Sequence, residues 1–136
     1  MSAKSFATIS VRSSRKDQII DITGDVSQIV GKSGISSGIC FVYVPHTTAG
    51  VTINENADPS VKSDFLMGMS DIVPDDLGYS HMEGNSPAHI KASMTGISSS
   101  TIIDNGRLVL GTWQGIYFCE YDGPRSRKVH VKIIEG

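Results

Sequence analysis

The sequence predicts a single α+β domain dominated by an antiparallel β-sheet or β-sandwich. Most of its apolar residues lie in short runs rich in β-branched and aromatic residues, which are typical of strands. A few segments instead begin with capping residues and carry apolar residues at helical spacing. Short helices interspersed among hairpins favour an α+β protein. At 136 residues the chain has the length of one compact domain, so we expect residues 1–136 to form a single domain.

The N-terminal half predicts four strands. Phe6–Val11 alternates apolar and polar residues, and Gln18–Ile22 follows a polar turn, so we expect these two segments to pair as a hairpin. The continuous apolar run Ile39–Val44 predicts a buried strand that ends at Pro45. Val51–Asn54 predicts the next strand.

Three segments begin near a residue that caps helices and end near glycine or before proline. The clearest is the second, because an aspartate precedes proline there and the apolar residues that follow have helical spacing. We therefore expect a helix from Thr23 or Asp25 to Val30, one capped by Asp58 that ends before Pro74, and one from Pro87 to Gly96.

The remaining C-terminal residues predict strands. Asn105-Gly106 lies between two apolar runs, which is a strong signal for a β-hairpin. The expected strands are Ser100–Ile103, Leu108–Leu110, Ile116–Tyr121 and Val129–Ile134.

Charge and hydropathy exclude several classes of protein. The formal net charge is −2 and no dense Lys/Arg run is present, so we expect no nucleic-acid partner. No apolar run approaches the length of a membrane span, and the N-terminus has no apolar signal-peptide core, so we expect a cytoplasmic protein without a membrane partner. Cys40 and Cys119 lie in strand-like runs, and we expect buried free thiols there, with a disulfide as the alternative.

The segment from His81 to Lys91 concentrates two histidines, a carboxylate, an amide and an amine. If its first five residues are extended, His81, Glu83 and Asn85 share one face. Ser86-Pro87 then predicts a helix start, which places His89 in the first turn of a helix, where anions bind. The segment is typical of one half of an active site.

Three further clusters carry polar side chains at strand ends or turns, where function is common. We expect these clusters and the 81–91 segment to form one polar pocket for an anionic ligand. Each cluster also has a structural alternative, such as helix capping or a solvated loop. The three clusters are Pro45–Gly50, Asn54–Asn56, and the pair Thr112–Gly115 and Glu120–Arg125.

Metal binding is one specific possibility that the histidines raise. His46, His81 and His89 with a nearby carboxylate would hold a catalytic Zn²⁺ with one open position, as in a metal-dependent hydrolase. Their spacing matches no recognised signature, and HExxH is absent. No Walker, dinucleotide or GxSxG motif is present.

Five blocks, in this order, resemble the secondary thiamine-phosphate synthase family, which was long known only as an uncharacterised conserved family. The resemblance implies a β-sandwich of jelly-roll character with short flanking helices, assembled as a homotrimer with pockets near subunit boundaries. It also implies the joining of a pyrimidine-methyl diphosphate to a thiazole phosphate, with release of diphosphate. The five blocks are His46–Pro59, Glu83–Ser93, Asn105–Leu108, Leu110–Tyr117 and Glu120–Arg125.

For a reaction of this kind, diphosphate departure needs positive charge or preorganised donors, normally with Mg²⁺ on the phosphate oxygens. Proton transfer is expected from histidine, and a carboxylate or amide is expected to bind the aminopyrimidine, although the sequence does not separate Glu83 from Glu120 in importance. The expected catalytic residues are His46, Glu83, His89 and Glu120. The expected substrate-binding residues are Thr47, Thr48, Asn54, Glu55, Asn85, Lys91, Gln114 and Arg125. The broader expectation is a role on a phosphorylated small molecule, to which the synthase activity is secondary. A metal-dependent hydrolase and a non-catalytic, metabolite-binding trimer are the alternatives.

Overall fold

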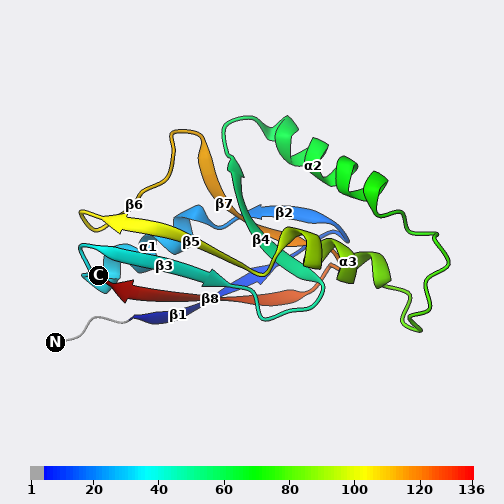
Figure 1. Cartoon of the computed structure of the whole chain (residues 1–136), viewed down its shortest axis with the longest axis horizontal. Helices are drawn as coiled ribbons and strands as arrows, with labels where there is room; N and C mark the ends of the chain where they lie inside the picture. The colour runs from blue at the N-terminus through cyan, green and yellow to red at the C-terminus, as the bar shows by residue number, and fades with distance from the viewer. Residues whose placement is uncertain (1–4) are drawn as a thin grey trace.

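The computed structural model describes residues 5–136 as one α+β domain with two curled antiparallel sheets and three helices (Figure 1). The larger sheet has the strand order β1-β8-β3-β5-β6, and the smaller one has the order β2-β7-β4. The strands are β1 (Phe6–Arg12), β2 (Gln18–Asp21), β3 (Gly38–Tyr43), β4 (Ala49–Glu55), β5 (Ser98–Asp104), β6 (Arg107–Leu108), β7 (Gln114–Glu120) and β8 (Ser126–Glu135). The helices are α1 (Thr23–Ser33), α2 (Pro59–Ile72) and α3 (Ser86–Thr95).

One hydrophobic core joins the two sheets. Val42 and Val131 of the larger sheet belong to the same buried cluster as Val51 and Phe118 of the smaller sheet, and Val26 of α1 completes it. Because side chains alternate along a strand, each strand contributes every second residue to this core. The sheets therefore hold the loops at their ends in fixed positions.

Local signals correctly predicted three helices and one turn, but the expected cap of α1 is wrong, because its N-cap residue is Ile22 and not Thr23 or Asp25. The Asp58 carboxylate accepts a hydrogen bond from the backbone N–H of Ser60 at 2.9 Å and caps α2, as predicted. Asn105 and Gly106 both have positive φ, 52° and 73°, and join β5 to β6 in the predicted hairpin. No helix among residues 5–136 is long and apolar enough to cross a membrane.

The predicted hairpin between the first two strands is wrong. All of β1 pairs with β8 in the larger sheet, whereas β2 pairs with β7 in the smaller sheet. The chain changes sheets at Ser13, whose backbone N–H donates to the carbonyl oxygen of Arg125 at 3.0 Å. Alternation therefore identified both strands but not their partners, because long-range contacts of Ser13 decide where the chain turns.

The extended conformation predicted for residues 81–85 is also wrong. These residues form a turn in which the Gly84 N–H donates to the His81 carbonyl oxygen at 3.2 Å, with Gly84 at φ +74°. Helix α3 begins at Ser86, so Asn85, not Ser86, is its N-cap residue. A glycine with positive φ bends the segment, and the two-residue repeat of a strand does not apply.

Both cysteines are buried free thiols, as predicted. Cys40 lies in β3 of the larger sheet and Cys119 in β7 of the smaller one. Burial raises the pKa of Cys40 to about 11 and that of Cys119 to about 12. Neither thiol is a nucleophile at neutral pH.

Candidate functional site

A polar cleft of about 360 Å³ lies where β7 ends, β4 begins and α3 starts. Helices α2 and α3 and the segment that joins them lie at the end of the molecule far from the C-terminus (Figure 1). Three loops and one helix contribute the side chains of the cleft wall. These are Thr47, Thr48, Glu83, Asn85, His89, Asp122 and Arg125.

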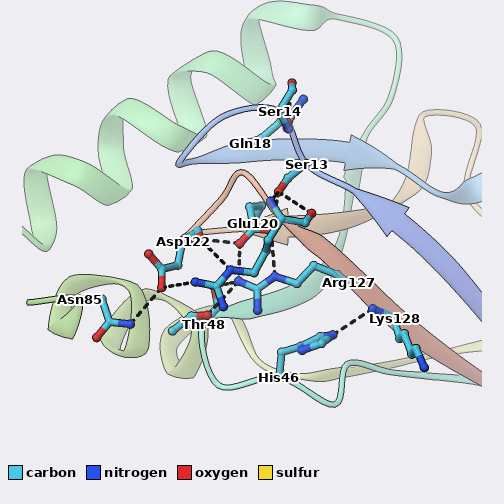
Figure 2. A network of polar contacts seen from close by, with 11 residues as sticks. Ser13, Ser14, Gln18, His46, Thr48, Asn85, Glu120, Asp122, Arg127 and Lys128 are labelled. Atoms are coloured by element: carbon cyan, nitrogen blue, oxygen red, sulfur yellow. Dashed lines mark hydrogen bonds and ion pairs between the residues drawn. The ribbon is translucent and has the colours of Figure 1, made fainter. Parts of the chain in front are cut away.

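A buried ion pair supports this cleft (Figure 2). The Arg127 guanidinium donates to both carboxylate oxygens of Glu120, and its Nε bond to Glu120 Oε1 is 2.9 Å long. The same guanidinium donates to the hydroxyl of Thr48 at 2.8 Å. The arginine therefore ties the end of β7 to the turn that precedes β4.

The Glu120 carboxylate is fully buried, with an exposed fraction of 0%, and accepts four hydrogen bonds. Two come from Arg127, one from the Ser13 hydroxyl and one from the Asp122 N–H. Burial by itself raises the pKa of this carboxyl, but the hydrogen bonds outweigh burial and hold its pKa below the ordinary value. Glu120, expected from the sequence to be catalytic, lies outside the cleft lining and orders the loop beside it.

Asp122 organises the side of the cleft formed by the β7–β8 loop. Its Oδ2 accepts hydrogen bonds from the Asn85 side-chain amide and from Arg125 Nη2, both at 2.9 Å. Arg125 Nε also donates to the Asp122 carbonyl oxygen at 2.9 Å. The backbone N–H of Arg125 donates to the Ser13 hydroxyl at 2.9 Å, which holds the main chain in place. The guanidinium is thus oriented while its side chain stays 49% exposed.

Asn85 has an unsatisfied acceptor. Because its amide nitrogen donates to Asp122, its Oδ1 is the free end, and this buried oxygen has no hydrogen-bond partner among residues 5–136. An N-cap asparagine ordinarily uses this oxygen to cap its helix, but here the side chain makes no capping bond with the described residues. The Asn85 side chain therefore binds the Asp122 carboxylate instead of capping α3.

His89 lies between two clefts. It lines the polar cleft and also a second, open cleft of about 490 Å³ beside Tyr79, His81 and Ile90. The His81 and His89 rings are perpendicular, with centroids 5.2 Å apart. His81 Nε2 lies 3.3 Å from Glu83 Oε1, so the two histidines and the carboxylate predicted for this segment do come together.

His46 lies next to the supporting network rather than in the cleft wall. Its Nε2 accepts the backbone N–H of Lys128 at 2.9 Å, so the neutral ring carries its proton on Nδ1. Partial burial and the nearby Arg127 guanidinium lower the pKa of His46. The ring is therefore neutral at physiological pH.

Three of the predicted substrate-binding residues lie elsewhere. Asn54, Glu55 and Gln114 are at the far end of the β4–β7 ladder, where Glu55 pairs with Gln114, whereas Ala49 pairs with Glu120 at the cleft end. Six residues of strand separate the two ends by about 20 Å. Asn54, Glu55 and Gln114 therefore do not line the polar cleft of their own chain.

Lys91 is also outside the cleft. Its exposed fraction is 3%, and its ammonium contacts the Asp17 carboxylate at 2.7 Å and the Ser70 hydroxyl at 3.4 Å. This lysine joins α3 to α2 and to the loop before β2. Its position is that of a structural anchor.

The predicted zinc ligands do not assemble in one chain. No group of three or more His, Cys, Asp or Glu side chains within residues 5–136 is arranged to hold a metal ion. Of His46, His81 and His89, the last two are neighbours, and His46 contacts Lys128 instead.

The sequence did not predict three residues that shape the site, namely Arg127, Ser13 and Asp122. The alternation of buried and exposed residues in β8 contains a signal for Arg127, because this residue points inward like Val129 and Val131. A charged residue at an inward position predicts a buried ionic partner. Asp122 lies within the Glu120–Arg125 cluster that the sequence singled out, although no role was expected for it. Ser13 carries no comparable local signal.

These observations define an α+β protein with an open polar cleft at one end of its sheets. The chain belongs to the UPF0047 family, since the family model described as "UPF0047 protein YjbQ-like" matches residues 7–136. The UPF0047 protein YugU of Bacillus subtilis is 50% identical over 128 residues, which are 93% of this chain and 97% of that protein. A UPF0047 protein of Methanocaldococcus jannaschii is 49% identical over 124 residues, 91% of this chain and 90% of that protein.

Solved structures show the same fold. An uncharacterised YjbQ/UPF0047 protein of Clostridium acetobutylicum superposes with a TM-score of 0.92 and 57% identity, over 94% of this chain and 99% of that chain. A YbjQ-like protein of unknown function from Sulfolobus solfataricus gives a TM-score of 0.93 at 36% identity, over 96% of both chains.

The thiamine-phosphate synthase assignment implied by the resemblance is wrong. The family model and these relatives carry descriptions of an uncharacterised family, and none of those descriptions indicates that activity or a transferase.

Proposed function

We propose that this chain binds a phosphorylated small molecule in the polar cleft and that His89 exchanges protons with the bound molecule. One observation supports this most strongly: an oriented guanidinium, threonine hydroxyls and the first turn of α3 converge on one open cleft. Arginine, hydroxyl groups and helix N-termini are the groups that bind phosphate oxygens in proteins. The cleft volume of about 360 Å³ suits a small metabolite.

Arg125 is the expected phosphate anchor. Its Nε and Nη2 are held by Asp122, which fixes the plane of the guanidinium and leaves Nη1 without a hydrogen-bond partner among the described residues. Thr47 is exposed on the same wall, and its hydroxyl is a second donor. A preorganised arginine loses less conformational entropy on binding than a free side chain.

His89 is the expected acid or base. Its imidazole is the side chain common to both clefts, so a molecule that extends from one cleft to the other passes beside it. Glu83 reaches the same region and contacts His81, which supports a chain of proton-exchanging groups.

Titration of the protein with inorganic phosphate and ethyl phosphate, followed by calorimetry, tests the binding site. Arg125→Ala is expected to weaken binding at least about tenfold, since a charge-assisted contact to phosphate is lost. Arg107→Ala, at the edge of the larger sheet, is the matched control and keeps the original affinity. Equal affinity of wild type and Arg125→Ala would contradict the proposed site.

The predicted self-association also has support. Ile39, Ile102 and Ile134 are neighbours across β3, β5 and β8, and all three are exposed on the outer face of the larger sheet. Phe41 and Tyr43 extend this face along β3. We propose that copies of the chain associate through it, as in the predicted homotrimer, because monomers rarely expose a large contiguous apolar patch.

The metal ions, the jelly-roll connections and the cytoplasmic location stay predictions. A Mg²⁺ ion bound with a phosphate ligand would use carboxylate oxygens, and Glu83 and Asp122 are the carboxylates of the cleft. Zn²⁺ would need a further ligand beside His81 and His89.

A further inference from the structure

The described residues that line the polar cleft include carboxylates as well as cationic groups. Glu83 and Asp122 are the two carboxylates among them, and Arg125 is the one permanently charged cation. Asp122 is ion-paired with Arg125, as Glu120 is with Arg127 behind the cleft, whereas Glu83 has no permanent cation beside it among the described residues. A site built only for a dianion would not leave such a carboxylate in its wall, because like charges repel the ligand.

Several acceptor oxygens at this wall have no donor. Asp122 Oδ2 takes both of the side-chain hydrogen bonds to this carboxylate, and Oδ1 takes none from the described residues (Figure 2). Glu83 is 77% exposed and contacts only His81 through Oε1. The neighbouring Asn85 Oδ1 is buried without a donor. A hydrogen-bond donor on a ligand would satisfy the exposed carboxylate of Glu83, whereas the enclosed Asn85 oxygen lies out of its reach.

The donors of Arg125 and Thr47 and the Glu83 carboxylate occupy one cleft but different elements. The donors of Arg125 and Thr47 come from the loop after β7 and the turn before β4, and the Glu83 carboxylate comes from the segment before α3. A ligand with opposite charges at its two ends would match both groups at once.

We propose that the ligand of this cleft is a phosphate ester that also carries an amine, with the phosphate bound by Arg125 and Thr47 and the ammonium by Glu83. This inference rests on the proposed phosphate site and specifies the class of its ligand. A few-carbon aminoalkyl phosphate is small enough for a cleft of about 360 Å³.

Three phosphate monoesters with the same two-carbon chain test the inference: 2-aminoethyl phosphate, 2-hydroxyethyl phosphate and ethyl phosphate. Each is titrated into the full chain with EDTA present, so that no metal ion neutralises the carboxylates. We expect 2-aminoethyl phosphate to bind at least about tenfold more tightly than ethyl phosphate, with the hydroxyl compound between them. Added salt is expected to reduce this preference, because exposed charges are screened.

Glu83→Gln separates the ammonium contact from the phosphate contact. This exposed side chain is replaced without loss of a buried bond, so the variant is expected to fold normally. The amine preference should fall to about threefold or less, while the affinity for ethyl phosphate stays the same or rises. Asp64→Asn, at an exposed position of α2, is the control and keeps the full preference.

The outcomes distinguish the two proposals. Similar affinities for all three esters in wild type would overturn the amine proposal and leave the phosphate site intact. An amine preference that survives Glu83→Gln would also overturn it, because the ammonium would then lie elsewhere. Binding of none of the three esters would overturn both proposals.

Discussion

Arg127 and Glu120 form an ion pair in which both side chains are almost completely buried, and this pair connects the end of β7 to the turn before β4. Buried charges are costly to remove from water, and such a pair is stable only when each partner is satisfied. Here the carboxylate has four donors, and the guanidinium also bonds Thr48. The pair therefore specifies the geometry of the cleft more than it adds stability.

Removal of one side chain of the Arg127–Glu120 pair is expected to lower the free energy of unfolding much more than removal of both. Arg127→Met leaves an unpaired buried carboxylate, so the free energy of unfolding should fall by about 3–5 kcal/mol. Arg127→Met combined with Glu120→Leu should cost clearly less than the sum of the two single changes, as a denaturant double-mutant cycle would measure. Additive losses would show that the two side chains do not stabilise each other.

Acid should destabilise the protein through Glu120. Its pKa is lower in the folded chain than the ordinary 4.5, so the unfolded state binds more protons over the range between the two values. The stabilisation is thus complete above about pH 4.5 and is lost as the pH falls through the folded pKa. Unfolding curves from pH 7 to pH 3 should show a steeper loss for wild type than for Glu120→Gln, which lacks this proton uptake. Parallel pH profiles would contradict the assignment.

Lys91 should contribute to stability and not to ligand affinity. Lys91→Met removes the partner of Asp17 and should lower the free energy of unfolding by about 3 kcal/mol. Below its unfolding transition the variant should bind ethyl phosphate within about twofold of wild type, since a change that small is about 0.4 kcal/mol. A tenfold loss of affinity with unchanged stability would instead support the substrate-binding role expected from the sequence.

The outer face of the larger sheet should control self-association. Light scattering of the wild type is expected to give the mass of three chains of 14.6 kDa each. Ile39→Lys places a charge in the row of exposed isoleucines and should reduce the mass toward one chain. Met82→Lys, at a fully exposed position of the segment before α3, is the control. An unchanged mass in Ile39→Lys would exclude this face as the interface.

Local chemistry made much of the fold predictable. The Asp58 cap, the Asn105-Gly106 turn and most of the apolar strands depend on residues close in sequence and were correct, whereas the strand predicted at Leu108–Leu110 is Arg107–Leu108. The partner of β1 depends on β8, more than a hundred residues away, and no local pattern contains that information. The positions of most strands and the pairing within one tight hairpin were therefore predictable from sequence, whereas pairing between distant strands was not.

The candidate site was predictable only in part, for a related reason. Chemical type identified Thr47, His89 and Arg125, which do meet in the cleft. The same criterion selected Lys91 and Glu120, which are buried in ion pairs, because residue type does not reveal whether a charge already has a partner. Burial patterns along strands would have separated the two groups better than chemical type.

The two buried thiols report which part of the folded protein opens transiently. Cys40 belongs to the core between the two sheets, whereas Cys119 belongs to a second buried cluster with Met69 of α2 and Ala92 of α3. A thiol reagent reaches either sulfur only when the structure that covers it opens. The relative modification rates of the two cysteines therefore tell whether the core between the sheets and the cluster beneath the helices open together or one before the other.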